Sequence, residues 1–263
     1  DLASVYGSAG ISNFGDDDTV TVTGVTAAAA DLNTIAAGNT LQITVAGTVV
    51  TITGSASDLA TMYNNADGGA GDGITGLGDE AVTVTDATSA AADLNSVNTD
   101  TTGVVDTATN VTTITGSVAA LQALQTAIGA GQVSAKSNYA VTISDASVDA
   151  GDINAMSGIG VGKTTGTISV TAADDINGTE AELTTFFTNV GNNKISTSVD
   201  YNLEAEDATI TAANIKTFDG YTIGIITAPN ATTITGSLSD LAAVFASGEV
   251  SLPGAISITI TGT

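Results

Sequence analysis

The chain has 263 residues, of which 28 are acidic and 4 basic, so its formal net charge is −24, and it contains no Cys, His or Trp. This composition excludes disulfide bonds, zinc sites built from Cys and His, and a Ser-His-Asp triad. Four basic side chains cannot neutralise many phosphates, so we expect no nucleic-acid partner. The sequence has no apolar run long enough to span a membrane, and an anionic membrane surface would repel it.

Three segments near the N-terminus carry the pattern of strands. In Val20–Thr23, apolar residues alternate with Thr, which is typical of a half-buried strand. Leu41–Val45 and Thr48–Thr53 have similar patterns and flank Ala46-Gly47. The two short strands fit either a hairpin or the corner of a solenoid, and the sequence leaves both open.

The next segment, Ser55–Tyr63, changes to the helical period, because Leu59, Met62 and Tyr63 are spaced to lie on one face. Ser55 is the expected N-cap, and Asp58 favours the positive start of the helix. The equivalent cap position holds Ser117, Thr179 and Ser237. Helices of two or three turns would be marginal alone, so we expect packing to stabilise them.

The string Ile-Thr-Gly-Ser is an internal repeat. It occurs at Ile52–Ser55, Ile114–Ser117 and Ile234–Ser237, with a degenerate copy, Ile-Asn-Gly-Thr, at Ile176–Thr179. The copies therefore start 62, 62 and 58 residues apart. This spacing predicts four full units at 1–57, 58–119, 120–181 and 182–239, and a partial fifth unit at 240–263.

A second motif runs in phase with the first. Val-Thr-Val-Thr recurs in similar form at Val20–Thr23, Val82–Thr85, Val141–Ser144 and Ile258–Thr261. An Ala-rich stretch with an acid-apolar-Asn triplet follows the first three copies. It places Asn33, Asn95 and Asn154 in one slot and becomes Asn214-Ile215-Lys216 in the fourth unit. We expect these Asn side chains to satisfy backbone groups at equivalent places.

These repeats predict a β-rich repeat protein. We expect a β-solenoid-like fold of stacked parallel strands with short helices, because units of this size cannot bury a face alone. Each unit of about 60 residues would consist of two half-units of about 30, since the two motifs resemble each other. A chain of small β-sandwich domains is the rival interpretation, although about 60 residues is short for an immunoglobulin-type sandwich.

The motifs resemble the repeats of very long bacterial cell-surface proteins, especially those of marine cyanobacteria and other aquatic bacteria. The resemblance rests on GITGLGDEAVTVT at Gly73–Thr85, the ITGS-x-x-DL block and the AAADLN stretch, and it covers essentially the whole chain. The acidic, Thr-rich, Cys-free composition is also similar to that of surface-layer proteins. This resemblance implies an extracellular, repetitive protein with a mechanical or adhesive role. The third and fourth units depart from the tighter motifs.

Acidic loops are the candidate metal site. Carboxylates beside flexible backbone carbonyls suit Ca²⁺, so calcium binding is one hypothesis and solvated surface acids are the other. Gly68–Asp72 lacks one residue of the calcium-binding GGxGxD pattern. The candidate ligands are Asp16, Asp18, Asp67, Asp72, Asp79 and Glu80. No other cofactor is required.

Catalytic signals are weak. Glu180 and Glu182 form a close carboxylate pair of the kind used in glycoside hydrolysis, but no Trp, Arg or His accompanies it. Lys163-Thr164 resembles the end of a phosphate-binding loop, but Ser157 stands where that motif requires its leading Gly. We therefore expect a protein that is not an enzyme.

Two functions remain. The first is a structural subunit or repeat segment of an extracellular filament, sheath or surface layer, which forms a homopolymer through stacked strand-rich repeats. Ile256, Ile258 and Ile260 are the expected assembly residues, because an alternating strand there has no complete unit after it. The alternative is a calcium-stiffened adhesin stalk or spacer in a giant cell-surface protein, where the partner is further repeats of the same chain.

Overall fold

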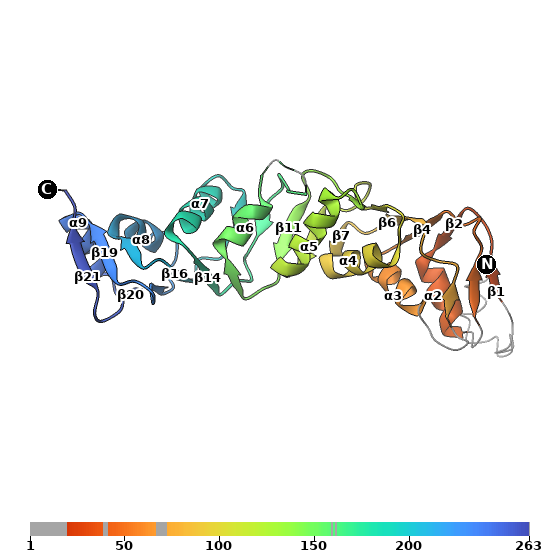
Figure 1. Cartoon of the computed structure of the whole chain (residues 1–263), viewed down its shortest axis with the longest axis horizontal. Coiled ribbons are helices and arrows are strands. Elements are labelled where there is room, and N and C mark those ends of the chain that lie inside the picture. The colour runs from red at the N-terminus through yellow and green to blue at the C-terminus, as the bar shows by residue number, and fades with distance from the viewer. Residues whose placement is uncertain (1–19, 39–41, 67–72, 159, 161, 263) are drawn as a thin grey trace. The chain divides into compact units, whose positions relative to one another are not determined.

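The computed structural model describes residues 20–38, 42–66, 73–158, 160 and 162–262. The chain divides into two compact units, Asp1–Tyr139 and Ala140–Thr263. Each unit consists of short strands that alternate with short helices (Figure 1). The predicted repeat boundaries are finer than this division and stay a prediction.

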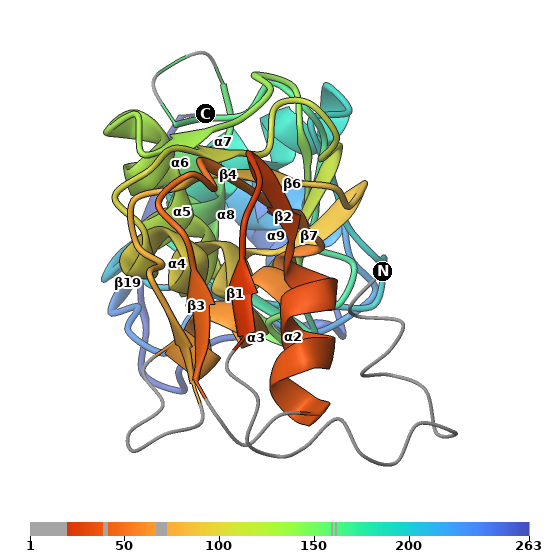
Figure 2. The same cartoon turned by 90° about the vertical axis from the view of Figure 1, so that its right-hand side faces the viewer.

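The first unit contains parallel strands in separate sheets. One sheet has the order β1-β3-β5, a second has the order β2-β4-β6-β8-β10, and β7 pairs with β9. Figure 2 shows β1 and β3 side by side, with α2 next to β1. The elements are β1 (Val20–Val22), β2 (Thr26–Ala28), α2 (Ala29–Gly38), β3 (Ile43–Val45), β4 (Thr51–Gly54), α3 (Ala56–Ala66), β5 (Ile74–Thr75), β6 (Ala81–Val84), β7 (Thr88–Ala90), α4 (Ala91–Asp100), β8 (Val105–Asp106), β9 (Thr113–Gly116), α5 (Val118–Gly129) and β10 (Val133–Ser134).

The second unit repeats this arrangement. Its strands form parallel runs with the orders β11-β13-β15, β12-β14-β16-β18-β20 and β17-β19-β21. The elements are β11 (Ala140–Ile143), β12 (Ser147–Asp149), α6 (Ala150–Met156), β13 (Ile168–Ser169), β14 (Asp175–Gly178), α7 (Glu180–Gly191), β15 (Ile195–Ser196), β16 (Asn202–Ala205), β17 (Thr209–Thr211), α8 (Ala212–Asp219), β18 (Ile226–Thr227), β19 (Thr233–Gly236), α9 (Leu238–Ala246), β20 (Val250–Ser251) and β21 (Ser257–Ile260).

The strand register resolves the turn at Ala46-Gly47. The strands on either side of it, β3 and β4, do not pair with each other: β3 pairs with β1 and β5, and β4 pairs with β2 and β6. The turn is therefore a corner between two sheets, and the hairpin alternative is wrong. The strands that neighbour each other in a sheet come from successive strand–helix repeats.

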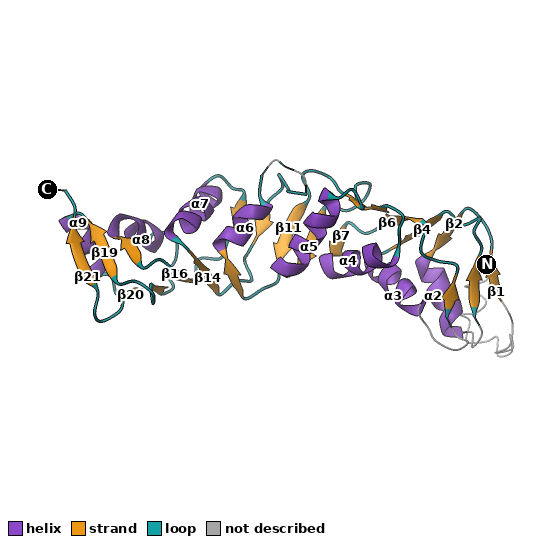
Figure 3. Ribbon diagram, viewed as in Figure 1, coloured by secondary structure: helices purple, strands orange, loops and turns teal. Residues whose placement is uncertain are grey.

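The helices also follow one another in contact. α2, α3, α4 and α5 pack in succession in the first unit, and α6, α7, α8 and α9 do so in the second (Figure 3). In α3, Leu59, Met62 and Tyr63 are all buried, which confirms the predicted apolar face. The repeated fold of parallel strands with short helices is thus as expected from the sequence.

Two kinds of helix start alternate along the chain. α3, α5, α7 and α9 begin after a capping Ser or Thr whose hydroxyl accepts a backbone N–H three residues on, as predicted for Ser55, Ser117, Thr179 and Ser237. α2, α4, α6 and α8 instead begin directly after a strand. We call the first kind capped helices and the second kind strand-continuous helices.

Candidate functional site

The Asn slot joins each strand-continuous helix to the capped helix that follows it. The Nδ2 atom of Asn33 donates to the carbonyl oxygen of Asp58 at 2.9 Å, and that of Asn95 donates to Ala120 at 2.8 Å. Asn154 donates in the same way to the carbonyl oxygen of Glu182, at 2.9 Å. These bonds confirm that the repeated Asn satisfies backbone groups at equivalent places.

The fourth unit replaces this hydrogen bond with an ion pair. Lys216 stands in the Asn slot of α8, and its Nζ atom lies 2.9 Å from Oδ1 of Asp240 on α9. The hydrogen bond from Lys216, together with one from Ser237, lowers the pKa of the Asp240 carboxyl below its ordinary value. The substitution of Lys for Asn in this unit therefore replaces a hydrogen bond with an ion pair, and the contact still joins the two helices at the same place.

The Gly of the ITGS motif allows a close approach between repeats. Gly54, Gly116, Gly178 and Gly236 each face the first Ala of the preceding strand-continuous helix, and a β-carbon added to them would stand 2.7–3.2 Å from that Ala's β-carbon. These Ala residues, Ala29, Ala91, Ala150 and Ala212, have no exposed surface. The two sequence motifs run in phase because their residues meet here.

An Asp after a strand caps a helix of the preceding repeat. Oδ2 of Asp86 accepts the N–H of Ala56, the first residue of α3, at 2.7 Å. Oδ2 of Asp207 accepts the N–H of Glu180, the first residue of α7, at 2.5 Å. The sequence analysis missed this role. The signal was an Asp directly after two of the four Val-Thr-Val-Thr copies, at Asp86 and Asp145.

Buried Thr residues shape equivalent turns. The hydroxyl of Thr101 accepts the N–H of Gly103 at 3.0 Å, and the hydroxyls of Thr164 and Thr222 accept the N–H groups of Gly166 and Gly224 at 2.9 Å. The three Thr residues are at most 7% exposed. Thr164, which belongs to the sequence that resembles a phosphate-binding loop, therefore occupies a repeated structural turn.

The carboxylate pair Glu180 and Glu182 also contacts the backbone. Glu182 closes a capping box with Thr179, and these hydrogen bonds lower the pKa of the Glu182 carboxyl. Oε1 of Glu180 accepts the N–H of Thr211 at 2.6 Å. Both carboxylates therefore hold helix starts and strand ends in position.

The calcium candidates do not gather in the described part of the chain. Asp16, Asp18, Asp67 and Asp72 lie outside the described residues. Asp79 is exposed, whereas Glu80 is 2% exposed and accepts the N–H of Gly78 at 2.8 Å. Within the described ranges, no three acidic side chains are grouped as metal ligands. Calcium binding stays a prediction.

The interior next to Glu80 contains Tyr63. Burial raises the pKa of the Tyr63 phenol, and the negative charge of Glu80 raises it further. A cavity of about 250 Å³ lies against this ring, lined also by Thr75 and Asp100. The nearby carboxylate and the burial both favour the neutral phenol.

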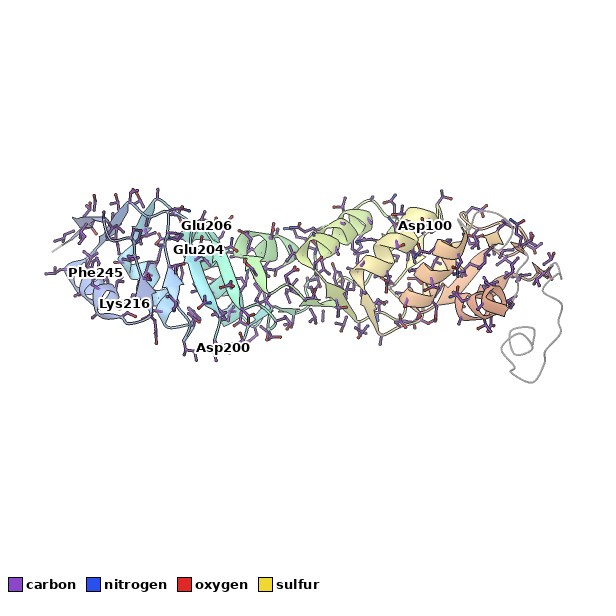
Figure 4. All side chains as sticks on the ribbon, turned by 90° about the horizontal axis from the view of Figure 1, so that it is seen from below. Asp100, Asp200, Glu204, Glu206, Lys216 and Phe245 are labelled. Atoms are coloured by element: carbon purple, nitrogen blue, oxygen red, sulfur yellow. The ribbon has the colours of Figure 1, made fainter. Side chains whose placement is uncertain are left out.

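A hollow lies over β14, β16 and β18. A cavity of about 670 Å³ is lined by Asp175, Asn177, Asn202 and Glu204, and Glu204 projects from β16 (Figure 4). Nδ2 of Asn202 donates to Oδ1 of Asp175 at 3.0 Å. These outward positions hold mostly Thr or Ala in other strands, whereas the inward positions stay apolar. Four polar departures from the repeat pattern, at Asp175, Asn177, Asn202 and Glu204, therefore lie together on this face.

The predicted assembly strand is the last strand of its sheet. Among the described residues, β21 pairs with β19 alone, in parallel register from Ser257 to Ile260. Ile258 and Ile260 are 54% and 60% exposed, and Ile256 is half-buried. The structure thus places all three at one open end of the second unit.

Comparison of the chain with protein-family models, curated proteins and solved structures gives no match. Among the described residues, no helix combines the length and apolar character needed to cross a bilayer.

Proposed function

We propose that the chain is a structural repeat segment of an extracellular filament, sheath or surface layer, in which strand–helix repeats stack as a β-solenoid. The role is mechanical, and the chain is not an enzyme. Copies of the same repeat, within one chain or between chains, are its partners.

The recurrence of the same contacts between successive repeats carries this proposal. The Asn slot, the Gly–Ala approach and the Asp cap each join one repeat to its neighbour, and each returns at equivalent positions. A fold held by nearest-neighbour contacts can be extended by adding repeats without redesigning its core. Such extension is what a filament or layer needs and what a catalytic domain does not need.

The surface chemistry supports an extracellular location. A net charge of −24 keeps copies soluble and apart except where specific edges meet. The outward positions of many strands carry Thr, as in the register Thr209–Thr233 and Thr211–Thr235. The chain also lacks thiols, which oxidise outside the cell.

Two measurements test the proposal. Antibody labelling of intact cells of the producing organism should stain their surface, and electron microscopy of purified protein should show filaments or layers, with and without calcium. Staining confined to permeabilised cells would contradict the proposal, as would protein that stays dispersed at every concentration and calcium level. Assembly that requires calcium would instead favour the stalk alternative.

A further inference from the structure

We propose that the hollow over β14, β16 and β18, together with the apolar residues beside it, is a docking surface for a basic segment of another protein. That segment is extended and places Lys or Arg next to apolar side chains. The inference goes beyond the proposed function, because it names a partner other than a copy of the chain. We call Asp175, Asn177, Asn202 and Glu204 the acidic hollow.

The acidic hollow breaks a pattern that the other repeats keep. In β4, β9 and β19, the Thr residues on either side of the buried Ile point outward, but in β14 these two positions hold Asp175 and Asn177. Asn202 and Glu204 stand beside them in register on β16. The strands that pair with β4 and β19 in the same register, β6 and β21, carry only Ala, Ser or Thr there. Four polar replacements on two adjacent strands therefore meet on one surface.

Hydrogen bonds within the acidic hollow engage both of its amide groups. Nδ2 of Asn202 donates to Oδ1 of Asp175 at 3.0 Å, and Nδ2 of Asn177 donates to Oε1 of Glu206 at 2.8 Å. Asp175 and Glu204 are exposed, and within the described ranges neither forms an ion pair. The surface therefore offers hydrogen-bond acceptors and negative charge. Ammonium and guanidinium groups suit it, because they carry donors and no acceptor.

Apolar side chains lie beside the acidic hollow. Ile225 lines it and is 52% exposed, and the N–H of Ile225 donates to Oδ1 of Asn202 at 3.0 Å. Two residues earlier, Ile223 is 69% exposed, and its N–H donates to the carbonyl oxygen of Val199, which is 65% exposed, at 2.9 Å. We call Val199, Ile223 and Ile225 the apolar rim.

The apolar rim is also a departure from the first unit. The equivalent backbone hydrogen bond there joins Thr102 to Gly78 at 2.7 Å. Ile223 and Val199 therefore stand where the first unit has a hydroxyl-bearing side chain and none at all. They precede β18 and β16, which have described strands on both sides, so their exposure does not arise from an end of the chain. Exposed apolar side chains grouped beside polar ones mark interaction surfaces.

Charge decides which partner this surface suits. The chain has 4 basic side chains and a net charge of −24, so a second copy would bring few positive charges and would be repelled as a whole. Nucleic acid would be repelled for the same reason. A basic segment is attracted both by the acidic hollow and by the charge of the whole chain. The apolar rim favours basic segments that also carry apolar side chains.

The hollow has room for an extended segment. Its volume is about 670 Å³, and its lining runs from Ser147 on β12 to Thr227 on β18. These strands are consecutive in the order β12-β14-β16-β18. Neighbouring strands lie about 4.8 Å apart, so the lining spans about 14 Å, which about four residues of an extended chain cover. A short segment that crosses the strands is thus sufficient.

Fluorescence anisotropy with the full 263-residue chain tests the docking. The probe is a labelled peptide in which Lys and Arg alternate with Val, and the comparison peptide has Gln in place of every Lys and Arg. Asp175→Asn and Glu204→Gln should each weaken binding of the basic peptide by about two- to fivefold, as expected for the loss of an exposed ion pair. Asp31→Asn is the matched control, because it removes an exposed carboxylate of the first unit and should leave the affinity unchanged.

The contribution of the apolar rim is measured separately. Ile223→Ser should weaken binding by about two- to fivefold and keep its salt dependence, whereas Glu204→Gln should reduce the salt dependence. Val25→Ser is the matched control, since Val25 is 67% exposed and lies in the first unit. Because the replaced side chains are exposed, the variants should keep the parent's melting temperature.

Disulfide trapping locates the bound peptide. The chain has no Cys, so each introduced thiol is unique. A basic peptide that carries one Cys should cross-link faster to Ser147→Cys, in the hollow, than to Thr26→Cys. Thr26 is the equivalent exposed position of the first unit, because it pairs with the first residue of β4 as Ser147 pairs with that of β14.

Three results would overturn the proposal: equal affinity of the basic and Gln peptides, unchanged affinity when Asp175→Asn and Glu204→Gln are combined, or equal cross-linking at the two positions. A hollow that binds Ca²⁺ in a calorimetric titration but does not bind the peptide would overturn it too. Each of these results leaves the proposed function intact, because surface labelling and assembly of the parent chain test that function.

Discussion

Gly236 of β19 lies directly against Ala212, the first residue of α8: a β-carbon added to Gly236 would stand 2.7 Å from the β-carbon of Ala212. This is the tightest of the four Gly–Ala approaches. The strand and helix come from neighbouring repeats, so their separation is set by the absence of a side chain at one position.

Gly236→Ala should destabilise the protein by about 1–3 kcal/mol, because an added methyl group overpacks this contact. Chemical denaturation measures the loss. Gly248→Ala is the control, since a β-carbon there meets nothing within 4 Å. Ala212→Gly combined with Gly236→Ala should recover part of the loss, and equal effects of the two Gly substitutions would contradict the packing argument.

Asn95→Ala should lower the free energy of unfolding by about 1–2 kcal/mol, because the carbonyl of Ala120 loses its side-chain donor. Denaturation and hydrogen exchange at the start of α5 measure the effect. Asn98→Ala, on the same helix, is the matched control. A loss no larger than that of the control would show that the Asn slot does not join the repeats.

Asp86→Ala should destabilise the first turn of α3 by about 1 kcal/mol, because the N–H of Ala56 loses a charged acceptor at a helix start. The amide of Ala56 should then exchange faster with solvent. Asp79→Ala, which removes an exposed carboxylate, should leave that rate unchanged. Unchanged exchange in Asp86→Ala would exclude the capping role.

The Lys216–Asp240 ion pair should make the contact between α8 and α9 sensitive to acid. The pKa of Asp240 is lowered in the folded state, so the pair contributes above the ordinary carboxyl pKa and is lost as pH falls through the lowered value. In an NMR titration, Lys216→Gln should raise the pKa of Asp240. Lys194→Gln is the control, and an Asp240 pKa that does not move in Lys216→Gln would contradict the pairing.

Alkaline pH should weaken the second unit through Tyr201. Burial raises the pKa of its phenol to about 12, and its hydroxyl donates to the carbonyl of Tyr221 at 3.0 Å. The unfolded chain ionises nearer to pH 10, so stability falls as pH rises from about 10 to about 12. Difference absorbance titration of Tyr201→Phe against the parent isolates this phenol. Ionisation near pH 10 in the folded protein would contradict the burial argument.

The local features of this protein could be read from its sequence. Ser55, Ser117, Thr179 and Ser237 cap helices as predicted, because a cap depends on neighbouring residues alone. The Asn slot could also be predicted, since residues that recur at one offset must meet equivalent surroundings. The ion pair in the fourth unit could not be predicted, because Lys216 contacts Asp240 only when α8 and α9 pack together.

What only the tertiary structure decided is which repeats face each other and which surfaces stay open. Ala46-Gly47 fitted a hairpin as well as a corner, because the turn sequence does not specify the partner of a strand. Asp86 and Gly54 act across repeats, on Ala56 and Ala29, so their roles appear only when strands about 30 residues apart lie side by side. By itself the sequence determined the period and the apolar pattern, because both are local. Phe245 is 51% exposed, whereas Tyr63 and Phe187, which also stand eight residues after a capping residue, are each 2% exposed. This difference depends on which neighbour each side chain has, and only the folded chain supplies neighbours.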